Sequence, residues 1–229
     1  MDPIISIVMP AFNEEKNIGN VLSSLHKVME SVRLPYEIIV VDDGSTDKTK
    51  ELAYRHKASV LTNGGNQGKG YALKRGFQHA KGDIIITIDA DGSHDPGDIK
   101  RLLLPIFNGA DMVLGSRLVA GIGKNNTKKL HIFGNSLINL LIRIATGKGV
   151  TDSQTGFRAC RRKMLKQIEI VSKGYQIETE LTVKSLKNGY TFEEVPVTFK
   201  KRVNGCSGIR PLYDGVKIFK TIVKSTINS

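Results

Sequence analysis

The chain has 229 residues, 40% of them hydrophobic, so it can form one large α/β domain or two small ones and is too apolar to be disordered. Its two cysteines, Cys160 and Cys206, form neither a disulfide framework nor a zinc-binding spacing, and no apolar run reaches the roughly 18 residues of a membrane-spanning helix. The net charge of +12 indicates either an anionic partner (nucleic acid, anionic lipid or a phosphorylated substrate) or simply a basic, solvated surface.

The first half of the chain alternates short apolar runs with amphipathic segments. Asn13 is expected to cap the first helix, in which apolar residues recur at helical spacing from Ile18 to Val32. Further helices are expected to start near Thr46, to end near Ala80 and to span 96–107. The expected strands are 4–9, Glu37–Val41, Ser59–Leu61, Ile84–Ile88 and Met112–Leu114. This alternation predicts an α/β fold, a Rossmann-like mainly parallel sheet flanked by helices.

After residue 117 the pattern changes to longer amphipathic segments with basic residues at intervals. Helices are expected at 128–146, Ile177–Leu186 and Pro211–Ile227, and a strand at Phe192–Phe199. No repeat or linker separates the two parts. We therefore expect a single domain over 1–229, with the acidic motifs in its first half, about 1–117, and amphipathic, basic helices in its second half, about 118–229.

Two acidic motifs directly follow buried strands. Ligands of doubly wound sheets bind beyond the carboxyl ends of the strands, so we expect the two motifs to meet in space. Asp42 and Asp43 suit the ribose hydroxyls and base N–H of a nucleoside, although an Asx-turn that caps the next helix is the alternative. Asp89 and Asp91 offer the hard oxygen ligands that Mg²⁺ or Mn²⁺ prefers, together with diphosphate oxygens.

Basic residues near turns are candidates for binding phosphate. The glycine-rich segment 63–70 either brings its N–H groups and Lys69 to phosphates or is a flexible connector. Arg117 follows Gly115 and Ser116 at the end of a strand, Arg202 lies in a flexible basic loop, and arginine suits bidentate phosphate contact. The basic cluster from Arg158 to Lys166 adds to the positive charge of the second half.

Five motifs resemble one enzyme family when they are taken in order. IVMPAFNEEKNI, IIVVDDGSTDKT, IDADGSHDP, GSR and DSQTGFRACRR are similar to the inverting family 2 glycosyltransferases of the GT-A fold. Within that family they most resemble dolichyl-phosphate mannose synthases and related polyprenyl-phosphate glycosyltransferases. The resemblance covers roughly residues 3–210. It implies that the first half binds a GDP- or UDP-sugar, that the second half binds the acceptor, and that Mg²⁺ or Mn²⁺ assists.

The resemblance also implies roles for individual residues. Asp42 and Asp43 would contact base and ribose, Asp89 would support diphosphate and metal, and Asp91 would be the principal metal ligand. Arg117 and Arg202 would hold the acceptor phosphate. Ser93 stands where many relatives carry glutamine, and Gly208 where they often carry lysine. The remaining residues of the implied nucleotide-sugar site are Pro10, Ala11, Phe12, Glu14, Lys69 and Ala90.

The acceptor decides whether a general base is needed. A lipid monophosphate is already anionic at neutral pH, whereas a sugar hydroxyl needs a base, for which Asp152 is the candidate. The resemblance implies transfer of mannose first, or of glucose or N-acetylhexosamine, to dolichyl or polyprenyl phosphate. Two amphipathic segments, 128–146 (Ile132, Leu137, Leu140, Ile144, with Lys128, Lys129 and Arg143) and 211–227, either suit a bilayer interface or pack their apolar faces against the domain.

Two alternatives stay open at this stage. One is a soluble glycosyltransferase that extends a saccharide. The other is a non-catalytic protein that binds anions or nucleic acid, although no basic stretch is interleaved with stacking aromatic residues, so we expect no nucleic acid partner. A cytoplasmic location, peripheral on the cytosolic face of a membrane, is expected, because the start MDPIISIVMP lacks a signal peptide's basic region.

Overall fold

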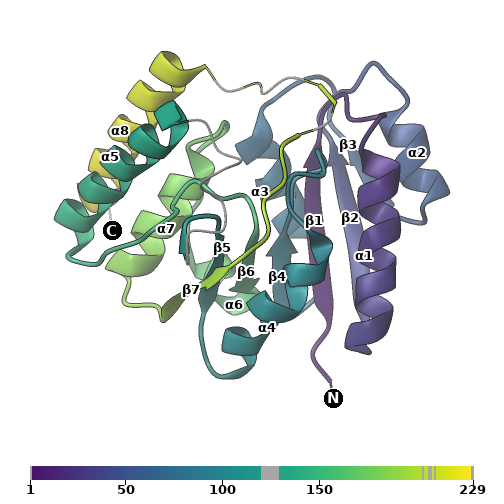
Figure 1. The fold of residues 1–229 in the computed structure, drawn as a ribbon, viewed down its shortest axis with the longest axis horizontal. Helices are drawn as coiled ribbons and strands as arrows, with labels where there is room; N and C mark the ends of the chain where they lie inside the picture. The colour runs from purple at the N-terminus through teal and green to yellow at the C-terminus, as the bar shows by residue number, and fades with distance from the viewer. Residues whose placement is uncertain (1, 120–128, 203, 206–207, 209, 228–229) are drawn as a thin grey trace.

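A computed structural model describes residues 2–119, 129–202, 204–205, 208 and 210–227 (Figure 1). Its centre is a seven-stranded sheet with the order β3-β2-β1-β4-β6-β5-β7. The strands are β1 (Ile5–Ala11), β2 (Tyr36–Asp42), β3 (Ser59–Thr62), β4 (Ile84–Thr87), β5 (Met112–Ser116), β6 (Arg158–Arg161) and β7 (Phe192–Pro196). Only β6, among these strands, runs antiparallel to its neighbours. The predicted mainly parallel α/β sheet is confirmed.

Alternate residues of the central strands supply two hydrophobic cores, one on each face of the sheet. Ile7 of β1 belongs to the core beneath α1 (Ile18–Val32) and α4 (Ile99–Phe107). Its neighbour Val8 belongs to the core beneath α3 (Lys69–His79), α6 (Arg162–Gln167) and α7 (Ile177–Lys187). Burial on both faces explains why the central strands read as continuous apolar runs.

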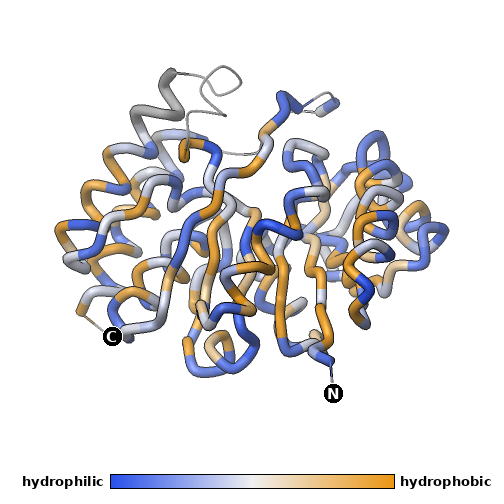
Figure 2. The backbone as a smooth tube through the Cα atoms, turned by 60° about the horizontal axis from the view of Figure 1, so that its bottom comes forward, coloured by the Kyte–Doolittle hydropathy of each residue, from blue (hydrophilic) through white to orange (hydrophobic). Residues whose placement is uncertain are grey.

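Two long helices, α5 (Lys129–Thr146) and α8 (Pro211–Ile227), pack against each other and against α7 at the β7 end of the sheet (Figure 1). Ile142, Ile218 and Ile222 form the buried centre of this third core. Hydrophobic positions recur along both helices in Figure 2. In the described part of the chain, no helix combines the length and hydropathy that crossing a bilayer requires.

The expected cap of the first helix is wrong. Helix α1 begins at Ile18, and Asn17 occupies the N-cap position, but its side chain makes no capping hydrogen bond to the first turn of the helix. Asn13 instead adopts a left-handed conformation with φ of 56°, which asparagine tolerates, and its Oδ1 accepts from the Thr46 N–H at 2.9 Å. It therefore ties the loop after β1 to the loop after β2. Helix α2 starts later than predicted and spans Thr49–Arg55.

The second half of the chain departs most from its predicted elements. Strand β6 and helix α6 were not predicted, because half of the strand sequence RACR is basic. Strand β7 ends at Pro196 instead of Phe199, and Phe199 forms an isolated bridge with His94. A short 3₁₀ turn, Pro96–Asp98, precedes α4. Strand β6 lies between β4 and β5, so strands from both halves share one sheet.

Candidate active site

A cleft of about 1210 Å³ opens at the carboxyl ends of the parallel strands. Its walls come from the loops after β1, β4 and β5, from the start of α3, and from α5, α7 and α8. The sequence-predicted residues that line it are Pro10, Ala11, Phe12, Glu14, Asp43, Lys69, Asp89, Ala90, Asp91, Arg117 and Arg202. Asp42 and Asp152 are not among its lining residues. The two acidic motifs and the two arginines therefore meet at one site.

The two carboxylates after β2 each hold a loop. Asp42 Oδ1 accepts from the Ser45 N–H at 3.2 Å, three residues on in the turn after β2, and does not reach the first turn of α2. Asp43 accepts from Asn63 Nδ2 at 2.6 Å and from the Gly68 N–H at 2.7 Å. These donors stabilise two adjacent charges that are almost fully buried. Asp43 thereby shapes the glycine-rich loop, and contact of Asp42 and Asp43 with a nucleoside stays a prediction.

Lys69 lies between two carboxylates at the base of the cleft. Its Nζ is 2.7 Å from Asp89 Oδ1 and 2.8 Å from Glu178 Oε1. Burial by itself lowers the pKa of Lys69, but the two carboxylates outweigh it and raise that pKa. Burial tends to raise the pKa of Asp89, but Lys69 outweighs it and the net shift is downward. Both groups are therefore charged at neutral pH.

Glycine at position 156 is required for this arrangement. A Cβ on Gly156 would stand 2.6 Å from Asp89 Oδ2 and 2.9 Å from Lys69 Nζ. Real Cβ atoms do not approach so closely, so a larger residue would displace the ion pair.

Asp91 faces the cleft between the loop after β4 and the loop that precedes α8. Its Oδ1 accepts from the Ser93 N–H at 2.9 Å, and its Oδ2 is 3.7 Å from Arg202 Nη1. Arg202 Nη2 also forms an ion pair with Glu14, whose pKa is raised by burial. Ser93 therefore acts on Asp91 through its backbone, and Arg202 reaches the acidic motif from 111 positions away.

The acidic side chains fit a divalent cation that is completed by a substrate. No group of three or more His, Cys, Asp or Glu side chains is placed to hold a metal ion among the described residues. Mg²⁺ usually takes one or two carboxylates and fills its remaining positions with water and phosphate oxygens. Asp91, with Asp89 beside it, provides that donor set, so the residues present fit Mg²⁺ or Mn²⁺ bound with a diphosphate.

His94 lines the cleft and is packed between two aromatic rings. Its ring centroid lies 5.2 Å from that of Phe157 and 5.3 Å from that of Phe199. Burial lowers the pKa of His94 to about 4, so the ring is neutral at pH 7. Its Nδ1 is buried and has no hydrogen-bond partner in the described part of the chain.

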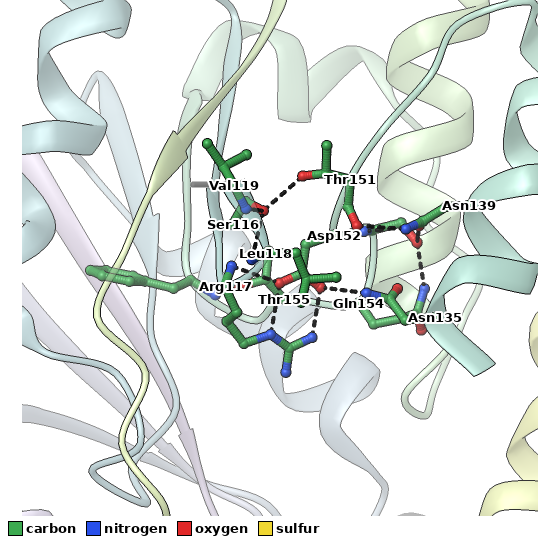
Figure 3. A network of polar contacts seen from close by, with 12 residues as sticks. Ser116, Arg117, Leu118, Val119, Asn135, Asn139, Thr151, Asp152, Gln154 and Thr155 are labelled. Carbon is green, nitrogen blue, oxygen red and sulfur yellow. Dashed lines mark hydrogen bonds and ion pairs between the residues drawn. The ribbon is translucent and has the colours of Figure 1, made fainter. Parts of the chain in front are cut away.

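Arg117 is held by Asp152 in a bidentate pair (Figure 3). Arg117 Nε and Nη2 donate to Asp152 Oδ2 and Oδ1, both at 2.7 Å. The Asp152 side chain is fully buried, and although burial tends to raise its pKa, Arg117 outweighs it and the pKa is lowered. A general base needs a free oxygen in the cleft and a pKa near the working pH, so this geometry does not fit the expected role of Asp152.

The basic cluster from Arg158 to Lys166 is not one continuous anion-binding surface. Arg158 is 1% exposed and donates to the carbonyls of Ser153, Thr155 and Glu178. It thereby fixes the loop before β6, beneath the cleft. Arg161 donates to the carbonyl of Ala110, near the end of α4. Part of the positive charge that suggested an anionic partner therefore has a structural role.

Sequence reasoning missed three polar residues near the site. Glu178 lies in the first turn of α7, and Asn135 lies on α5; both line the cleft. Glu194 on β7 supports the turn that carries Asp152. An acidic pair in the first turn of a helix, QIETE, was the available signal for Glu178. Asn135 and Glu194 had none, because their partners are distant in sequence.

Comparisons with known proteins agree with this geometry. A family model described as Glycosyl transferase family 2 matches residues 6–169. The polyprenol monophosphomannose synthase of Mycolicibacterium smegmatis is 33% identical over 213 residues, 88% of this chain and 79% of that protein. The dolichol-phosphate mannosyltransferase of Pyrococcus furiosus is 33% identical over 215 residues, 90% of this chain and 59% of that protein.

A solved structure shares the fold over nearly the whole chain. The glucosyl-3-phosphoglycerate synthase of Mycobacterium tuberculosis, in complex with Mn²⁺, UDP and phosphoglyceric acid, superimposes with a TM-score of 0.77 at 26% identity. The match covers 98% of this chain and 78% of that one. The same enzyme has also been solved with Mg²⁺ and UDP, with a TM-score of 0.76.

Proposed function

The chain belongs to glycosyl transferase family 2, and on this premise we propose that it transfers a hexosyl group from a nucleotide sugar to a polyprenyl or dolichyl phosphate. Mannose is the first candidate, followed by glucose and N-acetylhexosamine. One observation carries the proposal: a single cleft in which the Asp89 and Asp91 carboxylates lie beside the Arg117 and Arg202 guanidinium groups. Carboxylates suit a metal-bound diphosphate, and arginines suit an anionic acceptor.

The donor end of the cleft is assigned to the acidic side. Asp91, assisted by Asp89, would hold Mg²⁺ or Mn²⁺, which neutralises charge on the departing nucleoside diphosphate. Pro10, Ala11 and Phe12 line the same wall and offer an apolar surface to a base or sugar face. UDP and either Mn²⁺ or Mg²⁺ in the related synthase support this assignment.

The acceptor end is assigned to the arginines. A phosphate monoester carries most of its second charge at pH 7, since its second pKa is about 6, so it attacks the anomeric carbon without a base. The engagement of Asp152 with Arg117 agrees with such an acceptor, because it leaves Asp152 unable to accept a proton in the cleft. The names of both lipid-specific relatives point the same way.

A lipid acceptor lies in a membrane, and α5 and α8 present a face that suits contact with a membrane surface. Their outward residues are large, apolar and exposed, and Lys220, Lys224 and Arg143 lie among them. The exposed apolar residues are Leu137, Leu140, Ile144, Val216, Phe219, Val223 and Ile227. Each basic residue near an anionic surface adds about 1 kcal/mol. We assign this face to peripheral contact with the cytosolic leaflet; Lys128 and the side chains of Lys129 and Ile132, expected to take part, lie outside the described residues.

Transfer of radiolabel into organic-extractable lipid tests the proposal. The assay uses GDP- and UDP-sugars, a short polyprenyl phosphate and Mg²⁺ or Mn²⁺, with Asp91→Asn as the test variant. The variant Glu193→Gln, at an exposed position on β7, is the control. We expect label from one donor to enter lipid, and Asp91→Asn to lower the rate by about 10²–10³. Label that moves only to 3-phosphoglycerate or to a saccharide refutes the lipid acceptor while keeping the donor site.

A saccharide acceptor remains the second candidate, and one observation keeps it in view. Glu178 lines the cleft, is 4% exposed, and its Oε2 has no hydrogen-bond partner within the described ranges. A hydroxyl acceptor needs a base within hydrogen-bond reach, and Glu178 replaces Asp152 as the carboxylate for that task. Loss of saccharide transfer in Glu178→Gln, with donor binding unchanged, supports this second candidate.

A further inference from the structure

We propose that Asn135 and Glu194 are positioning residues for Arg117, and that both act through the turn that carries Asp152. They come from α5 and β7, on two sides of that turn. The inference rests on the proposed function, since it takes Arg117 to face an acceptor phosphate. Neither residue needs to touch the acceptor to set the direction of the guanidinium group.

The hydrogen-bonding capacity of the Asp152 carboxylate is fully used. Oδ2 accepts from the backbone N–H of Arg117 at 2.9 Å and from its Nε at 2.7 Å. Oδ1 accepts from Arg117 Nη2 at 2.7 Å and from Asn135 Nδ2 at 2.9 Å. A carboxylate offers about four lone-pair sites. Removing the Asn135 donor therefore leaves a fully buried charge underbonded on the oxygen that Arg117 Nη2 uses.

Glu194 holds the same turn from the sheet side. Its Oε2 accepts from the Thr151 N–H at 2.8 Å, and its Oε1 accepts from Thr151 Oγ1 at 2.9 Å and from the Asp152 N–H at 3.1 Å. Thr151 Oγ1 is also 2.7 Å from Ser116 Oγ, next to Arg117. A single carboxylate on β7 thus fixes the backbone from which the Asp152 side chain extends.

Helix α5 braces the opposite side of the turn (Figure 3). Asn139 Nδ2 donates to the Thr151 carbonyl at 2.6 Å, and Asn139 Oδ1 accepts from Ser153 Oγ at 2.6 Å. Asn135, one turn earlier on the helix, is 7% exposed. The turn is therefore held between a helix and a strand, and a rigid support of this kind suits precise orientation of a charged group.

The result is a guanidinium group with one defined free direction. Nε and Nη2 are bound to Asp152, and the Arg117 Cζ lies 5.1 Å from the centroid of the Phe199 ring. Nη1 has no partner among the residues that the structure describes, and Arg117 lines the cleft. A displacement of about 1 Å in a positioning group can lower a rate on the order of 10². Small changes at Asn135 or Glu194 are thus expected to affect acceptor use.

The first test is steady-state kinetics of Asn135→Leu and Glu194→Gln, with Glu193→Gln as the matched control on the same strand. We expect kcat/KM for polyprenyl phosphate to fall about tenfold to a hundredfold in both test variants. The KM for the sugar nucleotide should stay within twofold. A purely structural role would change donor and acceptor constants together, and that result overturns the proposal.

A double-mutant cycle with Arg117→Lys identifies the route of the effect. When two residues act as a unit, the reductions in kcat/KM that their single substitutions cause do not add in the double variant. Glu194→Gln should therefore cost less than twofold when Arg117 is already lysine. If Glu194→Gln lowers kcat/KM in the Arg117→Lys protein as much as it does in the natural protein, Glu194 acts independently of Arg117.

A crystal structure of Glu194→Gln separates this inference from the proposed function, because it needs no turnover. Arg117 displaced from its bidentate contact with Asp152 supports the positioning role even if lipid phosphate proves not to be the acceptor. An unchanged Arg117–Asp152 pair refutes the positioning role even if lipid transfer is demonstrated.

Discussion

Replacing Lys69 with methionine is the sharpest test of the electrostatic arrangement at the base of the cleft. Lys69 Nζ lies 2.7 Å from Asp89 and 2.8 Å from Glu178, and their side chains are 15%, 28% and 5% exposed respectively. Removing one partner of a buried ion pair costs about 3–5 kcal/mol, because the other charge stays buried without compensation. We expect the lower end, about 3 kcal/mol, since water in the cleft reaches Asp89.

The expected loss depends on pH in a defined direction. The pKa of Asp89 lies below its ordinary value of 3.8 because Lys69 outweighs the opposing effect of burial. Its ion pair therefore contributes stability above about pH 4, and that stability disappears as the pH falls through the lowered pKa. In Lys69→Met the Asp89 carboxylate loses the ammonium group that lowers its pKa and becomes easier to protonate. The difference from the natural protein should be largest near pH 7 and should shrink toward pH 4.

Urea unfolding at pH 4.5 and pH 7.5 measures this difference, with exposed Lys50→Met on α2 as the matched control. In thermal unfolding, a loss of about 3 kcal/mol in the free energy of unfolding corresponds to a decrease in Tm of roughly 6–12 °C for a protein of this size. Mn²⁺ alone should stabilise the variant more than the natural protein, because Asp89, beside Asp91, then has no competing ammonium group. An equal loss at both pH values would refute the electrostatic reasoning and indicate lost packing.

Three further expectations follow from burial and space. Arg158→Met should lower the free energy of unfolding by about 3 kcal/mol or more in urea titrations, because it leaves several buried carbonyls without a donor; a loss below 1 kcal/mol contradicts this. Gly156→Ala should reduce transfer by on the order of 10² because its Cβ meets Asp89 and Lys69, whereas Gly149→Ala, with open space around it, should not. Leu140→Glu combined with Phe219→Glu should abolish co-sedimentation with anionic vesicles at unchanged Tm, since both side chains are about half exposed; retained sedimentation argues against this membrane face.

The strand-end motifs were predictable because they depend on local order. Apolar runs bounded by Gly, Asp and Pro predicted β1, β2 and β4, and parallel pairing brings their carboxyl ends to one edge of the sheet. The sequence therefore predicted that Asp42, Asp43, Asp89 and Asp91 lie together; Asp43, Asp89 and Asp91 line the cleft, whereas Asp42 is not among its lining residues. Strand β6 was not predictable in this way, because its burial comes from neighbours that lie far away in the chain and half of its own residues are basic.

The sequence by itself determined the fold class and the family, and most of the site residues that it predicted line the cleft. Only the tertiary structure decided which charge neutralises which. Lys69 meets Glu178 from α7, Arg202 meets Glu14 across 188 positions, and Asp152 binds Arg117 instead of facing the cleft as a base. Helical and strand periodicity reports a residue's local environment, whereas an ion pair between distant segments leaves no periodic trace. The roles of the charged residues therefore follow from packing, which sets their burial and their partners.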